Sequence, residues 1–231
     1  MKKILLKTNK NVDFDINRDE EYLDFRKRKF SYKHRLKKRA EEIVWAFKKY
    51  SKADSQVILD IGCCDDYILD RIVKGFDIKL SVGMDINIDG LRNGISSNIK
   101  LISGDAEKIP FKDNSFDVVT ASALIEHLDD IGKLFNEIKR SLNSGGIAIF
   151  TIPNPVYDRL YFFKDKIGHK NQLEDSDILN LLSKSSLKLE EIKYFLVCPY
   201  FEIPFEKKLI KFFRKICLQK IMFNRLIVVR K

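Results

Sequence analysis

Val57-Ile58-Leu59-Asp60-Ile61-Gly62 is the stretch that decides the fold of this chain. A continuous apolar run of this length is typical of a strand buried on both faces of a parallel sheet. Gly62 follows the last apolar residue, and a residue without a Cβ lets the backbone turn and approach a ligand closely. We therefore expect an inner strand over Gln56–Ile61 whose carboxyl end opens a binding site.

Further strands and helices alternate on both sides of this stretch. Apolar runs predict strands over residues 79–85, 99–103, 117–121, 147–152, 187–195 and 226–229. Helical patterns cover residues 19–50, 67–74, 89–95, 131–142, 176–185 and 209–220. This order predicts an α/β fold, with a doubly wound, mostly parallel seven-stranded sheet and helices on both faces. The last two strands flank a helix, so we expect a hairpin that closes the sheet, with the last strand antiparallel.

Composition limits the class of protein. The chain has 231 residues, of which 45% are hydrophobic, and this excludes intrinsic disorder. We find no run of about 20 apolar residues that could cross a membrane. The four cysteines, Cys63, Cys64, Cys198 and Cys217, have no CxxC or zinc-ligand spacing. We therefore expect a cytoplasmic protein with reduced thiols and no metal.

Positive charge is concentrated near the two ends. The net charge is +10, and residues 26–39 carry nine Lys or Arg and no acid. Residues 199–231 carry nine more, against two acids. We divide the chain into a basic helical extension, residues 1–50, and an α/β domain, residues 51–231, with a basic amphipathic insertion at about 199–222. Nucleic acid, an anionic membrane or a solvated helix face would each account for such runs.

Acidic residues follow the first three predicted strands. Asp60 comes before Gly62, and Asp85 follows 23 residues after that glycine. In dinucleotide-binding folds an acid at about this interval accepts the ribose hydroxyls. Asp105, within Gly104-Asp105-Ala106, follows the third strand. Since the carboxyl ends of parallel strands meet at one edge, these acids predict a nucleoside-binding site there.

Taken in order, these motifs resemble those of the class I S-adenosylmethionine-dependent methyltransferases, in particular the small-molecule enzymes called type 11. The resemblance runs from Val57 to about Pro155, and its signature stretches are residues 57–63, 83–85, 104–111, 114–119, 124–128 and 142–146. It implies that Gly62 and its loop hold the methionine end of S-adenosylmethionine. It also implies that Asp85 binds the ribose and that Asp105 and Ala106 bind the adenine. The full set of cofactor residues carried over is Asp60, Gly62, Cys63, Asp85, Ile86, Asp105, Ala106 and Ser122.

The first loop departs from the family pattern Asp-x-Gly-x-Gly-x-Gly. Cys64 and Asp66 occupy the second and third glycine positions. We expect the Cys64 side chain to lie near the cofactor and the Asp66 charge to lie near the amino-acid end of the cofactor. A tolerated variant is the favoured interpretation, because the other cofactor positions remain, and a weakened or lost site is the alternative. The two missing glycines also argue against a nicotinamide-binding protein, whose fingerprint is G-x-G-x-x-G.

Methyl transfer from a sulfonium requires mainly alignment of the two partners and exclusion of water. A general base helps when the acceptor is a hydroxyl. His127 follows the fourth strand and is the candidate base, with a structural role in its loop as the alternative. His169 is a weaker candidate for contact with the acceptor, and we expect His34, in the basic helix, to be solvated.

The acceptor is only weakly indicated. Residues 207–220 alternate apolar and basic side chains, which suits a helix at the surface of an anionic membrane, although an ordinary helix covering the sheet has the same pattern. The leading hypothesis is therefore a small-molecule acceptor, with a lipid-linked or glycan-related compound as one option, and a cytoplasmic protein that could lie at the membrane periphery. An RNA methyltransferase that uses the 26–39 run, and a catalytically degenerate binding protein, are the alternatives. Nucleic acid is not the favoured partner.

Overall fold

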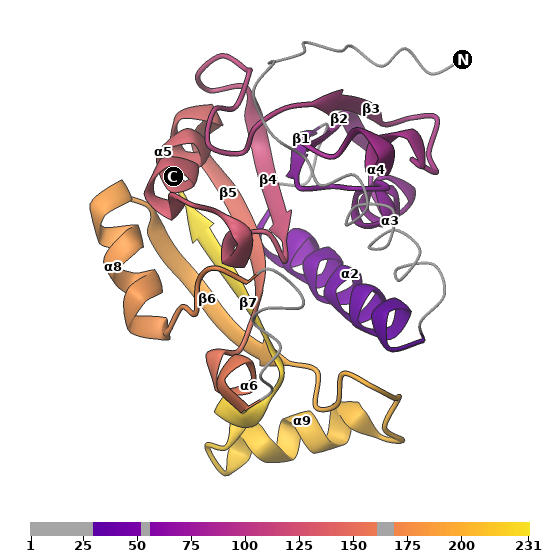
Figure 1. Cartoon of the computed structure of the whole chain (residues 1–231), viewed down its shortest axis with the longest axis vertical. Coiled ribbons are helices and arrows are strands. Elements are labelled where there is room, and N and C mark those ends of the chain that lie inside the picture. The colour runs from indigo at the N-terminus through magenta and orange to yellow at the C-terminus, as the bar shows by residue number, and fades with distance from the viewer. Residues whose placement is uncertain (1–29, 52–55, 161–168) are drawn as a thin grey trace.

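The computed structural model describes residues 30–51, 56–160 and 169–231. Within them, seven strands form one sheet in the order β3-β2-β1-β4-β5-β7-β6 (Figure 1). The strands are β1 (Gln56–Ile61), β2 (Ile78–Asp85), β3 (Lys100–Ser103), β4 (Phe116–Ser122), β5 (Leu142–Pro153), β6 (Lys188–Phe195) and β7 (Asn224–Arg230). β1 to β5 pair in parallel, and β7 is antiparallel to both of its neighbours. The predicted fold class, including the closing hairpin, is confirmed.

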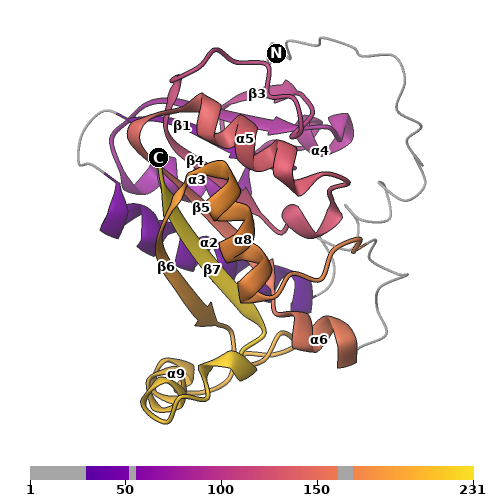
Figure 2. The ribbon, with the colours of Figure 1, turned by 90° about the vertical axis from the view of Figure 1, so that its left-hand side faces the viewer.

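Helices cover both faces of the sheet. The described helices are α2 (Phe30–Tyr50), α3 (Tyr67–Gly75), α4 (Ile88–Arg92), α5 (Ile131–Ser141), α6 (Pro155–Leu160), α8 (Asp175–Ser185) and α9 (Glu206–Lys215), with short 3-10 turns η1 (Ile125–His127) and η2 (Gln219–Ile221). α5 and α8 lie on one face, and α2 and α3 lie on the other (Figure 2). No described helix is both long and apolar enough to cross a bilayer.

Alternate side chains of the inner strands supply two separate cores. Leu59 and Ile61 of β1 pack with α5 and α8, whereas Ile58 packs with α2 and α3. Both sets are almost fully buried, as expected for a sheet covered on both sides. The continuous apolar run of β1 is therefore explained by burial on both faces.

Helix α2 belongs to the core of the α/β unit. Ala40, Ile43, Ala46 and Phe47 are buried against the sheet and α3. The first 29 residues lie outside the described part, so the basic residues 26–29 and the predicted start of the helix at residue 19 are not described. The prediction that His34 is solvated is wrong: its side chain is buried, stacks on Phe30 and lies 3.7 Å from Glu202.

Several element boundaries differ from the predicted ones. The sequence predicts a helix over residues 131–142 and a strand over 147–152, but the helix ends at Ser141 and β5 already begins at Leu142. Gly145, at φ +76°, lies where the pairing of β5 with β4 shifts register. The helix predicted over 209–220 begins at Glu206 and ends at Lys215. Cys217, at φ +58°, turns the chain away from the helix there.

Candidate functional site

The carboxyl ends of four parallel strands lie in register. Ile61 of β1 pairs with Met84 of β2 and with Ala121 of β4. Asp85 pairs with Ser103 of β3. The residues that follow these positions, from Gly62 to the segments after Ser103 and Ser122, therefore share one edge of the sheet. Most of the predicted cofactor residues come together at this edge.

The loop after β1 is held tightly against β2. Gly62, at φ +71°, and Cys63 both donate backbone N–H bonds to the carbonyl of Met84, at 2.8 and 3.2 Å. A Cβ on Gly62 would lie 3.1 Å from the Leu124 side chain, so both the dihedral angle and the space favour glycine here. Asp60, behind the loop, is buried and accepts a 2.6 Å bond from Thr120 Oγ1. Asp60 therefore ties β1 to β4 beneath the loop.

Asp85 connects the first loop to the end of β2. Its Oδ2 accepts the backbone N–H of Cys64 at 2.8 Å, and its Oδ1 accepts that of Asn87 at 2.8 Å. The side chain thus orients the first loop from the end of β2, where the resemblance places the ribose.

The side chain of Asp66 is engaged by the segment that follows α4. Asp66 is fully buried, and its carboxylate accepts backbone bonds from Ile95 at 2.9 Å and Ser96 at 3.2 Å. These partners lie in the segment after α4. The expectation that its charge would lie near the amino-acid end of the cofactor stays a prediction, but these bonds give the carboxylate a structural role in addition. The carboxylate serves to join the first loop to residues 95–96.

Both departures from glycine keep the backbone shape that glycine would adopt. Cys64 has φ +51° and Asp66 has φ +58°, both in the left-handed region. The space for the cysteine side chains comes from neighbouring glycines. A Cβ on Gly90 would lie 3.1 Å from Cys64 Sγ, and a Cβ on Gly83 would lie 2.8 Å from Cys63 Sγ. Cys64 Sγ is therefore directed towards α4. This arrangement supports the interpretation as a tolerated variant.

Helix α5 holds the segment after β3. Asp105 is exposed and accepts the backbone N–H of Glu107 at 2.8 Å, while Ala106 is buried. Arg140 donates to the carbonyls of Ile109 and Phe111, at 2.9 and 2.7 Å. Glu137 accepts the backbone N–H of Ile109 at 2.8 Å. These contacts determine where the predicted adenine-binding residues stand.

Two further predicted residues lie at the same edge. Ile86 follows Asp85 and its side chain is 40% exposed, which is unusual for a large apolar residue and leaves it accessible to a ligand. Ser122 ends β4, and its hydroxyl lies 2.8 Å from Thr151 Oγ1 of β5.

His127 and His169 meet just beyond the end of β4. Their ring centroids are 4.9 Å apart, with 70° between the planes. The backbone N–H groups of Lys170 and Asn171 both donate to the carbonyl of Glu126, at 2.7 and 3.1 Å. These bonds hold the His169 segment against η1. Because about 40 positions separate the two histidines, sequence spacing alone does not link them.

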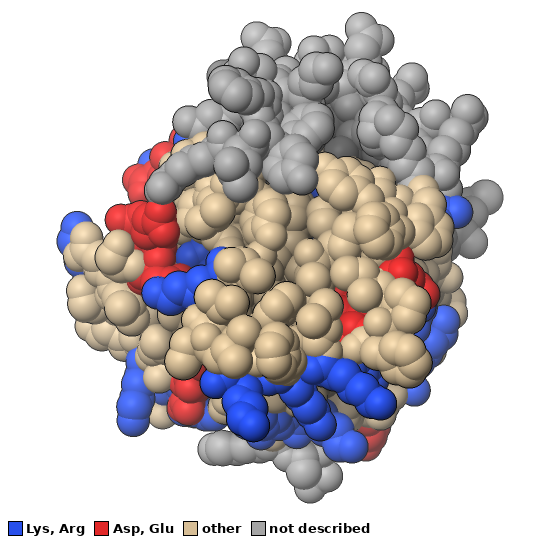
Figure 3. All heavy atoms as spheres, turned by 90° about the horizontal axis from the view of Figure 1, so that it is seen from below, with Lys and Arg blue, Asp and Glu red and all other residues tan. Residues whose placement is uncertain are grey.

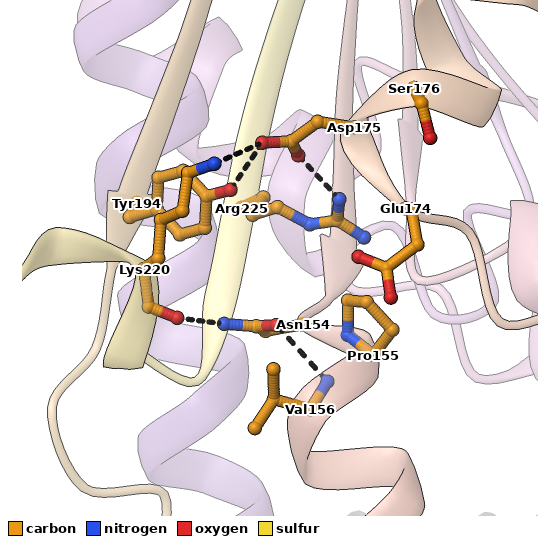
Figure 4. A pocket seen from close by; sticks show the side chains of 9 residues that line it. All are labelled: Asn154, Pro155, Val156, Glu174, Asp175, Ser176, Tyr194, Lys220 and Arg225. Atoms are coloured by element: carbon orange, nitrogen blue, oxygen red, sulfur yellow. Dashed lines mark hydrogen bonds and ion pairs between the residues drawn. The ribbon is translucent and has the colours of Figure 1, made fainter.

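A separate cavity of about 390 Å³ lies at the ends of β5, β6 and β7 (Figure 4). Buried Arg225 forms a 2.7 Å ion pair with Asp175, which also accepts a 2.5 Å bond from Tyr194. Burial raises the pKa of Asp175, but the bonds from Tyr194 and Arg225 and the nearby cationic charges outweigh it, so the pKa lies below its ordinary value. Strand order separates this polar cavity from the β1–β2 edge. The sequence pattern does not single out its residues, because only the closing hairpin brings them together.

The geometry fits S-adenosylmethionine. The first loop is shaped by Gly62, and the Asp66 carboxylate accepts backbone bonds from Ile95 and Ser96. Asp85 lies at the end of β2, and Asp105 is exposed at the neighbouring strand end. These residues would hold, respectively, the methionine end, the ribose and the adenine.

Comparison with known proteins gives the same assignment. The methyltransferase domain family matches residues 59–150. A malonyl-[acyl-carrier protein] O-methyltransferase of Legionella pneumophila is 30% identical over 112 residues, which are 46% of this chain and 39% of that protein. A ubiquinone/menaquinone biosynthesis C-methyltransferase of Idiomarina loihiensis is 33% identical over 108 residues, which are 47% and 38% of the two chains. The matched region thus spans about two fifths of these relatives.

Solved structures show the same fold. An S-adenosylmethionine-dependent methyltransferase from Mesorhizobium loti has a TM-score of 0.65 at 18% identity, covering 83% of this chain and 98% of that one. One from Archaeoglobus fulgidus has a TM-score of 0.64 at 20% identity, covering 91% and 99%. Residues 59–150 thus match the methyltransferase domain family, and the chain shares the fold of these S-adenosylmethionine-dependent methyltransferases.

Proposed function

We propose that this chain transfers the methyl group of S-adenosylmethionine to a small-molecule acceptor. The observation that carries this proposal is the convergence of the Gly62 loop, Asp85, Asp105 and Ser122 at one edge of a methyltransferase fold. Each of these positions follows a different strand, and we assign the Gly62 loop to the methionine end, Asp85 to the ribose and Asp105 to the adenine.

The protein residues act mainly by alignment. When bound, S-adenosylmethionine supplies a methyl group attached to a positively charged sulfur. After transfer of the methyl group, the sulfur compound is released as a neutral thioether. Asp85 orients the ribose and the first loop together, because its two oxygens already accept bonds from Cys64 and Asn87. The Asp60–Thr120 bond keeps the end of β1 against β4. A rigid loop lowers the entropic cost of bringing donor and acceptor into line.

His127 is the residue that we propose as proton acceptor for a hydroxyl substrate. It stands beyond the carboxyl end of β4, next to His169, on the side of the sheet where the methyl group would emerge. Proton removal by a positioned imidazole contributes typically about 10²- to 10⁴-fold.

Calorimetric titration with S-adenosylhomocysteine tests the cofactor site. Asp85→Asn keeps the side-chain shape but removes one acceptor oxygen, and we expect it to weaken binding about tenfold or more. Asp89→Asn is the matched control, since Asp89 lies close by in the sequence and pairs with Arg92 on the surface of α4. Absence of binding by the intact folded protein would refute the proposal and favour a catalytically degenerate binding protein.

We further propose that the acceptor is lipid-linked and is met at an anionic membrane. Seven of the twelve exposed large apolar side chains in the described part of the chain lie within residues 200–221: Tyr200, Phe201, Phe205, Phe212, Ile216, Leu218 and Ile221. α9 lies beyond the end of the sheet and only Glu206 of it is buried (Figure 1). Lys207, Lys208, Lys211 and Lys215 are exposed beside these apolar residues.

This face has the character of a membrane-surface element. Seen from the α9 end, Lys and Arg side chains border a broad area with few charges (Figure 3). Apolar side chains would enter the boundary between headgroups and acyl chains, and the lysines would contact anionic headgroups. Two of the relatives are a sterol 24-C-methyltransferase and a ubiquinone/menaquinone biosynthesis C-methyltransferase, names that favour an apolar acceptor.

An RNA acceptor is less well supported. Part of the basic run on α2 is paired: Lys37 lies 3.1 Å from Glu202, and Lys38 lies 2.6 Å from the buried Glu206. These pairs connect α2 to the first residue of α9 and to the segment before it, and they reduce the positive charge available for phosphates. Residues 26–29 lie outside the described part.

A further inference from the structure

We propose that Glu126, His127 and His169 bind a divalent transition-metal ion, such as Zn²⁺, beside the acceptor site. The Glu126 carboxylate and the two imidazoles each offer one ligand atom, and these atoms all lie within 4.8 Å of one another. Small side-chain rotations would bring them to the roughly 3.3 Å separation that bonds of about 2 Å to one ion require.

The strongest indication of a cation site is the burial of the Glu126 carboxylate. Its side chain is buried, with the residue only 3% exposed, and its Oε2 has no hydrogen-bond partner among the described residues. Burying a carboxylate oxygen without a partner is costly, so buried charges are normally paired or coordinate metals. The carboxylate that carries this oxygen belongs to the same cluster as the two imidazoles.

The cluster is also held in place by its surroundings. Backbone bonds from Lys170 and Asn171 to the Glu126 carbonyl place His169 next to η1. The Asn171 side chain adds a 2.6 Å bond to the carbonyl of Leu128. These hydrogen bonds do not involve the imidazole rings. They therefore hold His169 near His127 independently of any contact between the two rings. A site with such support can be present before an ion binds.

The donor set identifies the class of ion. Two imidazoles with one carboxylate are the ligands of catalytic zinc and of other late transition metals, whereas Mg²⁺ and Ca²⁺ prefer oxygen ligands. Three protein ligands leave a coordination position open for a water or a substrate oxygen.

The position of the cluster indicates which ligand would occupy the open coordination position of the ion. It lies at the sheet edge where the methyl group would be delivered, and this part of the inference rests on the proposed function. An acceptor with an oxygen donor would bind the ion, and its hydroxyl proton would pass to solvent because coordination lowers the pKa of the hydroxyl. The oxygen would then form the bond to the methyl carbon as the carbon–sulfur bond breaks, with the electron pair staying on sulfur. In the metal-loaded chain His127 would serve as a ligand, and its proposed role as proton acceptor would apply to the chain without an ion.

The test is metal binding by the full chain after chelator treatment. We expect one Zn²⁺ per chain by calorimetry, and a visible absorption band when Co²⁺ is added instead. Glu126→Gln and His169→Gln should each weaken Zn²⁺ binding by about 10-fold or more. Asp129→Asn is the matched control, because this exposed neighbour pairs with Lys170 but offers no atom to the cluster. We expect it to leave affinity unchanged.

Two results would overturn the inference: no stoichiometric binding by the wild-type chain, or binding that both ligand variants retain. Circular dichroism identifies a variant that fails to fold, and the His169 variant is informative even if the buried Glu126 cannot be replaced. S-adenosylhomocysteine binding is measured on the same preparations. Cofactor binding without zinc binding rejects only the metal site, whereas zinc binding without cofactor binding rejects only the proposed function.

Discussion

At the scale of single residues, Cys64 and Asp66 show how a glycine-rich loop can change composition and keep its course. Both adopt left-handed φ values, +51° and +58°. Asp tolerates this region better than most residues because of its short polar side chain. Asp66 also gains two backbone bonds at residues 95–96 that glycine could not make. Asp66, at a position where the family pattern has glycine, therefore gives up the conformational freedom of glycine and gains two specific hydrogen bonds.

Asp66→Ala should destabilise the fold more than it affects the cofactor. The change removes the acceptors of two backbone N–H groups and leaves a β-carbon at positive φ, so we expect a loss of roughly 1–3 kcal/mol in the free energy of unfolding. Urea denaturation measures this quantity, and S-adenosylhomocysteine affinity of the folded variant should stay within about threefold of the wild type. Unchanged stability with a large loss of affinity would place the carboxylate at the cofactor after all.

At the scale of elements, α5 acts as a brace for the segment between β3 and β4. Arg140 bonds two of its carbonyls and pairs with Asp113, at 2.8 Å, and with Glu137. We expect Arg140→Ala to lower stability by about 1–2 kcal/mol, because the carbonyls of a part-buried loop lose a charged donor. It should also weaken S-adenosylhomocysteine binding severalfold, since Asp105 and Ala106 lie in this segment. Lys139→Ala, the neighbouring position, is the control for both calorimetry and denaturation.

The same brace predicts a pH dependence. The hydrogen bonds from Arg140 hold the pKa of Glu137 below its ordinary value, aided by the Ile109 N–H and opposed by burial. Its contribution to stability is therefore complete above the unfolded pKa of about 4.3 and is lost as the pH falls through the lower folded value. Glu137→Gln should flatten this part of the stability curve when unfolding is followed between about pH 6 and pH 3. A variant curve parallel to that of the wild type would contradict the assignment.

At the scale of the whole molecule, the polar strand-end site and the apolar α9 face lie on one chain but on different elements. α9 is attached through the Lys38–Glu206 pair and through bonds such as that from the Val197 N–H to Glu206 at 3.1 Å. Because Glu206 is buried, the pair orients α9 and leaves Phe205 and Phe212 exposed, at 76% and 53%. The apolar face of α9 therefore has a defined position relative to the rest of the folded chain.

Vesicle binding tests that face. The chain should sediment with phosphatidylglycerol vesicles, much less with phosphatidylcholine, and less at high salt, because the lysines are screened. Phe205→Ser with Phe212→Ser should reduce the bound fraction severalfold. Leu179→Ser, an apolar position on α8 that is 48% exposed, is the control. Equal binding by wild type and the double variant would exclude α9 as the contact.

Much of this protein was determined by local sequence. Periodicity and apolar runs predicted all seven strands, most clearly the inner ones, since a strand buried on both faces must be apolar. The acids Asp60, Asp85 and Asp105 could be assigned to one edge from the order of the strands alone, because parallel pairing forces strand ends together. Element boundaries were predicted less closely: α5 stops at Ser141, where pairing of β5 with β4 competes with further helix.

Tertiary structure alone decided where several side chains point and which distant residues meet. Asp66 turns towards residues 95–96 because two backbone N–H groups there need an acceptor, and the sequence pattern shows no such demand. Glu126, His127 and His169 come together because the chain after α6 returns to bond the Glu126 carbonyl. Arg225 meets Asp175 across 50 positions through the closing hairpin. Local patterns specify elements through short-range sterics and burial, whereas contacts between distant loops depend on the path of the whole chain.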